Sequence, residues 1–159
     1  MWRWDQGRLL YFQFDVLKEI AKALVKFDNT DLSKCEDLFR NILVNDTGMP
    51  FLPSHYTIKR NYSRVFQCSF LANFHKNKLI VTDFCKDLAQ DNGTIKCVDD
   101  YLFNYIVRFR FPFPAFDNYN TTEPRIYPFC AIIKFLLSKI QSGEEAKASL
   151  DDIFNYIIS

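Results

Sequence analysis

The sequence predicts a mainly α-helical fold with one small β-hairpin. Hydrophobic residues make up 48% of the 159-residue chain, which is enough to bury a core. Glycine and proline are scarce, at four and six residues, so the chain has few of the tight turns that an all-β sandwich or barrel needs. The apolar residues also recur at intervals of three and four, which is the spacing of a helix.

Two amphipathic helices are predicted near the N-terminus. Asp15 is the expected N-cap of the first, whose apolar repeat ends before the turn at residues 28–30. A second repeat begins after Asp31 and stops near residues 45–48. Each repeat places its apolar side chains on one face, which is the face that a helix buries.

A third helix is predicted over residues 54–69. Ser54 is its expected cap, and the two prolines of segment 49–53 prevent that segment from being helical throughout. The predicted buried face consists of Ile58, Tyr62, Val65, Phe66 and Ser69. The opposite face is polar and basic, and it carries Tyr56, Arg60, Ser63, Arg64 and Gln67, with Lys59 and Asn61 on its flanks.

A hairpin is predicted over residues 70–82, followed by a short closing helix over 83–90. Residues 70–74 are expected to form a strand or a helix end, residues 75–78 a turn, and the β-branched residues 79–82 a strand. Three helices, a basic-tipped hairpin and a closing helix follow one another in the order of a winged helix-turn-helix, with the hairpin as its wing. This is therefore the predicted fold.

The C-terminal part is predicted to begin a second unit. Residues 1–110 form the expected winged-helix-like domain, and residues 111–125 an irregular connector. Residues 126–159 are expected to be the helical start of a second winged-helix-like unit, whose last helix is capped by Ser149. Because this part ends on an apolar helix with no strand after it, we expect the second unit to be truncated.

Positive charge is concentrated in one segment, although the whole chain has a formal net charge of only +1. Residues 47–82 contain no Asp or Glu, yet they hold Lys59, Arg60, Arg64, Lys76 and Lys78 together with both histidines, His55 and His75. This segment has 5 of the 20 Lys and Arg and none of the 19 Asp and Glu, so the rest of the chain has a balance of −4. Such a segregation of charge is typical of a nucleic-acid contact.

Duplex DNA offers closely spaced phosphates and a major groove that admits one helix, so the pattern favours a module that binds double-stranded DNA. We expect helix 54–69 to enter the major groove, with Arg60 pairing with guanine, and the 70–82 hairpin to lie on the backbone. The expected DNA contacts are His55, Tyr56, Lys59, Arg60, Ser63, Arg64, Gln67, Lys76 and Lys78.

Two other interpretations remain open at this point. The first is an ordinary solvated helix face next to a hairpin turn with solubilising lysines. The second is a protein-interaction winged helix without DNA contact, which would use the aromatic residues Phe111, Phe113, Phe116 and Tyr119.

Catalysis, cofactors and metals are not expected. His55 and His75 could serve as general bases, but no Ser or Cys has the local context of a nucleophile, and no nucleotide-binding or metalloprotease motif occurs. The five cysteines are widely spaced with no CxxC pair, which predicts free core thiols in a reducing cytoplasm. No stretch approaches the roughly 20 apolar residues of a membrane span, and the N-terminus lacks the pattern of a secretory signal.

A further set of motifs lies partly outside the charged segment. It consists of the opening Trp2–Arg8, the segment Arg60–Phe66 followed by Leu79–Thr82, and Tyr127–Phe129. These motifs resemble the N-terminal region of restriction-endonuclease-type proteins. The resemblance implies a bacterial or archaeal protein in which this region recognises DNA and a nuclease domain follows Ser159. No nuclease motif is present, so the chain itself is not expected to be an enzyme.

Overall fold

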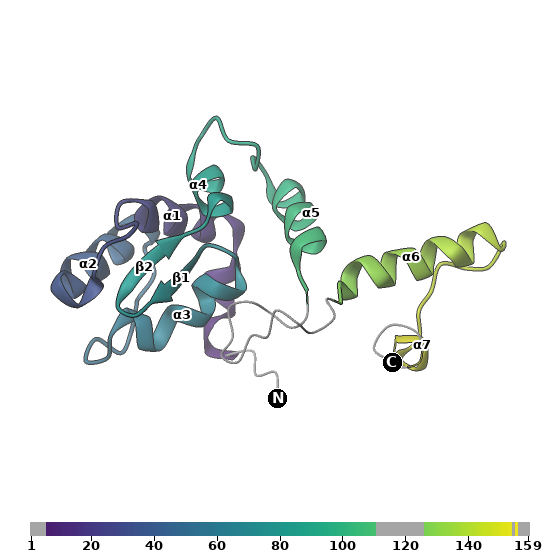
Figure 1. The fold of residues 1–159 in the computed structure, drawn as a ribbon, viewed down its shortest axis with the longest axis horizontal. Helices are drawn as coiled ribbons and strands as arrows, with labels where there is room; N and C mark the ends of the chain where they lie inside the picture. The colour runs from purple at the N-terminus through teal and green to yellow at the C-terminus, as the bar shows by residue number, and fades with distance from the viewer. Residues whose placement is uncertain (1–5, 111–125, 154, 156–159) are drawn as a thin grey trace. The chain divides into compact units, whose positions relative to one another are not determined.

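The computed structural model describes residues 6–110, 126–153 and 155. The chain forms two compact units, Met1–Tyr101 and Leu102–Ser159. Helices predominate in the described residues, and their two strands pair as one antiparallel sheet (Figure 1). The prediction of a mainly α-helical fold with a small hairpin is therefore confirmed.

The first unit is built around α1. Its helices are α1 (Phe14–Val25), α2 (Glu36–Thr47), α3 (Ile58–Cys68) and α4 (Asp83–Ala89), with the 3-10 helices η1 (Gln6–Phe12) and η2 (Leu32–Lys34). Helix α1 packs against both α2 and α4 (Figure 1). Fully buried side chains of the core include Leu17, Ile20, Leu24, Phe39, Leu43, Phe66 and Leu88.

The ends of the first two helices differ in detail from the prediction. The N-cap position of α1 is Gln13, and Asp15 lies instead in the first turn. Its negative charge there interacts favourably with the positive end of the helix dipole. The Asp31 carboxylate caps η2, and α2 begins only after that short helix. Gly48 ends α2 with a φ of 66°, a left-handed conformation that suits a residue without Cβ.

Helix α3 is shorter than predicted. Its N-cap is Thr57 and not Ser54, because the Thr57 hydroxyl accepts a hydrogen bond from the Arg60 N–H at 3.2 Å. The predicted start of the helix is therefore wrong, and His55 and Tyr56 lie in the turn that precedes it. The predicted buried face is confirmed, since the side chains of Ile58, Tyr62, Val65, Phe66 and Ser69 are all buried.

The hairpin is confirmed, with shorter strands than the 70–82 range suggested. Strand β1 (Ala72–His75) pairs antiparallel with β2 (Lys78–Val81). The turn consists of Lys76 and Asn77, and Lys76 has a positive φ of 57°. The second strand therefore starts one residue earlier than predicted.

Strand β2 is also hydrogen-bonded along its other edge, by the loop between α1 and α2. The Asn29 N–H donates to the Leu79 carbonyl at 2.8 Å, and the Leu79 N–H donates to the Thr30 carbonyl at 3.0 Å. Asp31 forms an isolated antiparallel bridge with Lys78. The hairpin is thereby braced against the helices of the first unit.

The remaining helices are α5 (Val98–Arg108), which crosses the border between the units, α6 (Pro128–Gln141) and α7 (Leu150–Ile153). Ser149 caps α7 as predicted: its hydroxyl accepts from the Asp152 N–H at 3.0 Å, and its own N–H donates to the Asp152 carboxylate at 2.9 Å. The predicted connector lies outside the described residues. No described helix combines the length and the apolar composition needed to cross a membrane.

All five cysteines are free thiols, but they do not all lie in the core. Cys85 is buried, Cys97 is exposed, and Cys35, Cys68 and Cys130 are half-buried. The prediction of core thiols is therefore correct for Cys85 alone, because wide spacing says nothing about which helix face a cysteine occupies. Burial raises the pKa of the Cys85 thiol to about 12. Among the described residues, no cluster of His, Cys, Asp or Glu has a geometry that could hold a metal ion.

Candidate nucleic-acid interface

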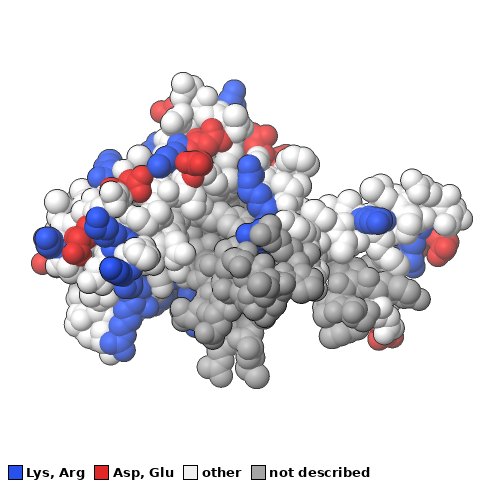
Figure 2. Space-filling view, viewed as in Figure 1, with Lys and Arg blue, Asp and Glu red and all other residues white. Residues whose placement is uncertain are grey.

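Helix α3 and the hairpin both lie within residues 47–82, the acid-free segment that contains no Asp or Glu. In Figure 2, Lys and Arg side chains gather at the lower left, over the hairpin and α3, while most of the visible Asp and Glu lie toward the upper part of the first unit. Arg60, Arg64, Lys76 and Lys78 are all exposed. The segregation of charge seen along the sequence is therefore also a segregation in space.

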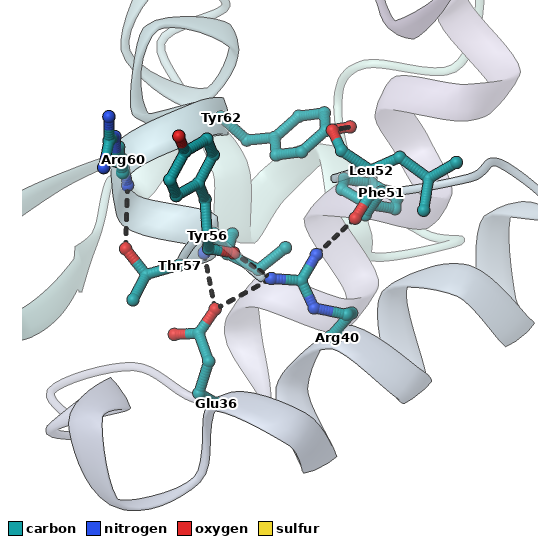
Figure 3. A network of polar contacts seen from close by, with 9 residues as sticks. Glu36, Arg40, Phe51, Leu52, Tyr56, Thr57, Arg60 and Tyr62 are labelled. Atoms are coloured by element: carbon teal, nitrogen blue, oxygen red, sulfur yellow. Dashed lines mark hydrogen bonds and ion pairs between the residues drawn. The ribbon is translucent and has the colours of Figure 1, made fainter. Parts of the chain in front are cut away.

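Two charged residues of α2 hold the chain that leads into α3. Arg40 is only 9% exposed, and its guanidinium donates hydrogen bonds to the carbonyls of Phe51 and Tyr56. Glu36 Oε1 lies 3.4 Å from Arg40 Nη2 and accepts a hydrogen bond from the Ile58 N–H (Figure 3). Helix α2 thereby satisfies the backbone groups of this loop and fixes where α3 begins.

Tyr62, on the buried face of α3, holds the same loop from within the core. Its hydroxyl donates to the Leu52 carbonyl at 2.8 Å, and its ring lies 4.7 Å from the Phe51 ring and 5.2 Å from the Tyr11 ring. Burial and the hydrogen bond with Tyr62 raise the pKa of Tyr11 well above its usual range. Tyr11 therefore stays uncharged, and the aromatic cluster supports α3 from its inner side.

On the exposed side, Arg60 rests on an aromatic ring. Its guanidinium carbon lies 3.8 Å from the centroid of the Tyr56 ring, and the His55 ring lies 4.2 Å from that ring on a tilted plane. Arg64 lies one turn further along α3. In the part of the chain that the structure describes, neither Arg60 nor Arg64 forms an ion pair. Their positive charges are therefore not neutralised by a carboxylate there.

Two other polar residues of α3 contact the hairpin. The Lys59 ammonium donates to the Lys76 carbonyl and lies 3.4 Å from Asn77 Oδ1. Gln67 Nε2 donates to Asn73 Oδ1 at 2.7 Å. These contacts bind α3 to the strand and the turn of the hairpin, so the two elements present their polar side chains from a connected surface.

One carboxylate lies beside the hairpin tip. Asp31, which bridges Lys78 through the backbone, accepts hydrogen bonds from the Ser33 hydroxyl and N–H. These bonds lower the pKa of the Asp31 carboxyl, and the positive charges of Lys34 and Lys78 lower it further. Part of the positive potential of Lys78 is therefore offset, which leaves Lys76 as the less compensated charge of the tip.

The structure sorts the residues predicted to contact DNA into four places. His55 and Tyr56 precede α3, and Lys59, Ser63 and Gln67 share the face of α3 that adjoins the hairpin. Arg60 and Arg64 lie on the other exposed face of α3. Lys76 lies in the hairpin turn, and Lys78 follows the turn as the first residue of β2. Tyr56 and Arg60 are brought into contact, whereas Lys59 and Gln67 have partners within the protein.

Sequence reasoning missed Glu36 and Arg40, which support α3 from behind, and it placed Tyr62 on the buried face without its hydrogen bond to Leu52. The only signal for the first two is their spacing of four residues, which is typical of a helical ion pair and does not show that Arg40 is buried. Glu36, Arg40 and Tyr62 position the site and do not form its surface.

The chemistry available on this surface is that of hydrogen-bond donors and cations. Guanidinium and ammonium groups, together with the Ser63 hydroxyl, suit an anionic ligand that also offers hydrogen-bond acceptors. Comparisons with protein-family models, with curated proteins and with solved structures give no match for this chain.

Proposed function

We propose that this chain is a double-stranded DNA-binding module, in which α3 enters the major groove and the hairpin lies on the DNA backbone. The observation that carries the proposal is the exposed face of α3, where Arg60 and Arg64 lie without an ion-pair partner among the described residues. Helix α3 is bound to a hairpin whose tip carries Lys76 and Lys78. An isolated α-helix is narrow enough to enter a major groove about 12 Å wide.

The order of the elements supports a winged helix-turn-helix. Helices α1, α2 and α3 precede the hairpin, and α4 follows it. The bridge between Asp31 and Lys78 supports the same fold, because it attaches the wing to the segment between the first two helices. Residues 126–159 as the start of a second winged-helix-like unit remain a prediction from the sequence.

Within this proposal, the residues have separate roles. Arg60 pairs with the major-groove edge of guanine, and Ser63 and Arg64 contact bases or phosphates. Lys76 and Lys78 neutralise phosphates and carry no sequence information. Arg60→Ala is then expected to cost about 1–3 kcal/mol and to relax specificity, whereas Lys76→Ala weakens the binding of all sequences alike.

The resemblance to restriction-endonuclease-type proteins gives the module its proposed context. The module recognises DNA, and cleavage belongs to a C-terminal nuclease domain of the same cytoplasmic, prokaryotic protein. In that role the chain needs no catalytic residue, cofactor or metal of its own.

The proposal is tested by binding of the chain to mixed-sequence duplex DNA over a series of salt concentrations. We expect a steep fall in affinity with salt for the wild type, and a shallower slope with weaker binding for the double variant Arg60→Ala/Arg64→Ala. The matched control is Lys18→Ala/Lys22→Ala, which also removes two positive charges, but from lysines that pair with Asp91. Equal binding by wild type and the arginine variant, or no binding even at low salt, would refute the proposal.

The second candidate function is protein binding without DNA contact. The aromatic residues first considered for it, from Phe111 to Tyr119, lie outside the described residues. One observation favours it: α6 has no buried residue, and Phe129, Ile133, Leu137 and Ile140 are exposed at helical spacing. The same salt series separates the two functions, because apolar docking does not weaken steeply with ionic strength.

A further inference from the structure

The contact between Tyr56 and Arg60 has a consequence for which base the module selects. A free arginine side chain samples many rotamers, and ordering it against a base costs conformational entropy. At 3.8 Å from the Tyr56 ring, the Arg60 guanidinium already has a partner on one face. The N–H donors lie in the plane of the guanidinium and point outward from its edge, so a ring against its face does not consume them.

The backbone of Tyr56, whose ring supports Arg60, is held from the core. The Tyr56 carbonyl accepts a hydrogen bond from the buried Arg40, and Arg40 in turn lies beside Glu36, which accepts from the first N–H of α3. The hydroxyl of Thr57, the next residue, accepts from the Arg60 N–H (Figure 3). The backbone positions from which the Tyr56 ring and the Arg60 side chain extend are therefore fixed before any ligand arrives, and the contact at 3.8 Å joins the two side chains.

The geometry points to Tyr56 as the positioning residue that orients Arg60 for guanine. This inference rests on the proposed DNA-binding function, in which Arg60 pairs with guanine, and adds the residue that sets this selection. Tyr56 acts through Arg60, and its hydroxyl has no part in the effect. The guanidinium edge pairs with the N7 and O6 atoms of guanine, which are both acceptors in the major groove. Adenine places a donor where guanine has O6, so a guanidinium held in this orientation disfavours it.

Four duplexes serve as probes, of alternating d(GC), d(IC) and d(AT) sequence and of d(GC) with 7-deazaguanine. Inosine keeps N7 and O6 but lacks the minor-groove amino group, whereas 7-deazaguanine lacks N7. The wild type is expected to bind the d(GC) and d(IC) duplexes alike and to bind the other two more weakly. Preference for d(GC) over d(IC) would instead show recognition in the minor groove and overturn the inference.

The variants are Tyr56→Leu, which removes the ring, and Tyr56→Phe, which keeps the ring without the hydroxyl. We expect Tyr56→Leu to reduce the ratio of d(GC) to d(AT) affinities about two- to fivefold, with the salt dependence unchanged, and Tyr56→Phe to retain the ratio. The matched control is Tyr127→Leu, since Tyr127 lies in the second unit and has the same exposed fraction as Tyr56, 36%. A thermal unfolding curve for each variant shows whether the fold is retained.

The outcomes separate this inference from the proposed function. If Tyr56→Leu keeps the ratio of d(GC) to d(AT) affinities of the wild type, Tyr56 does not position Arg60, while DNA binding stands. The same follows if Tyr56→Phe reduces this ratio as much as Tyr56→Leu does. Steep salt dependence with equal affinity for all four duplexes also refutes the role of Tyr56 and leaves the DNA-binding module intact. Absence of any binding at low salt refutes both.

Discussion

Replacing Arg40 by methionine should destabilise the first unit more than any exposed-charge substitution. The change keeps a long side chain in place but removes the donors to the Phe51 and Tyr56 carbonyls, and it leaves Glu36 without its ion-pair partner. A carbonyl left buried without a partner costs about 1–3 kcal/mol, and removing one member of a buried ion pair typically costs about 3–5 kcal/mol. Because Glu36 keeps the Ile58 N–H, we expect a total near the lower end, about 3–4 kcal/mol.

Urea unfolding followed by circular dichroism measures this change. With a slope of about 1–3 kcal/mol per molar urea for a small domain, the midpoint should fall by at least about 1 M. The control is Lys26→Met, which breaks the Lys26–Asp46 ion pair at 2.9 Å on the surface, where the lysine side chain is 54% exposed. That variant should lose less than about 1 kcal/mol. If the midpoint of Arg40→Met falls no further than that of Lys26→Met, the hydrogen bonds of Arg40 do not stabilise the start of α3.

Three further predictions concern the cap, the thiols and the pH dependence of stability. Thr57→Ala removes the N-cap of α3 and should lower the free energy of unfolding by about 1 kcal/mol in the same urea assay, whereas Thr57→Ser should not; equal stability of the two variants would exclude a capping role. Iodoacetamide at mildly alkaline pH should modify the exposed Cys97 in the folded protein and leave Cys85 unmodified until denaturant is added, because burial raises the pKa of the Cys85 thiol to about 12; mass spectrometry of the peptides decides this. The Val81 N–H donates a hydrogen bond to the Asp28 carboxylate and holds its pKa below the usual range. The stability that the ionised Asp28 contributes is therefore present above the ordinary carboxyl pKa and is lost as the pH falls through the lowered value. Asp28→Asn should reduce this loss of stability at acidic pH, and an unchanged dependence of stability on pH would contradict the role of Asp28.

Local patterns were sufficient to predict most of the first unit. The buried face of α3 follows from the spacing of its apolar residues, and the hairpin follows from a β-branched run after a polar turn. The cap of α3 was misplaced at Ser54 because both Ser54 and Thr57 have a suitable hydroxyl. The choice between them is made by α2, whose Arg40 and Glu36 satisfy the backbone on either side of Thr57. Contacts between residues about 20 positions apart leave no periodic signal in a single sequence.

In the candidate site, too, local patterns were predictable from the sequence, whereas the partners of individual side chains were not. The acid-free segment identified which elements carry positive charge, and that property needs no knowledge of the fold. No pattern of residues indicates that Lys59 donates a hydrogen bond to the hairpin turn or that the Arg60 guanidinium lies against the Tyr56 ring. Both contacts depend on how α3 lies relative to the residues around it, and a helical wheel places Lys59 and Arg60 side by side without distinguishing their partners.

The hydrogen bonds on both edges of β2 also bear on self-association. A strand with an unpaired edge is a template for the backbone of another chain, and short sheets at a protein surface are common starting points for aggregation. The loop from Asn29 to Asp31 occupies the edge of β2 that faces away from β1. Within the described residues, the sheet is left with the outer edge of β1, which is only four residues long and carries the polar, exposed Asn73 and His75. The first unit thus offers little strand edge to other copies of the chain.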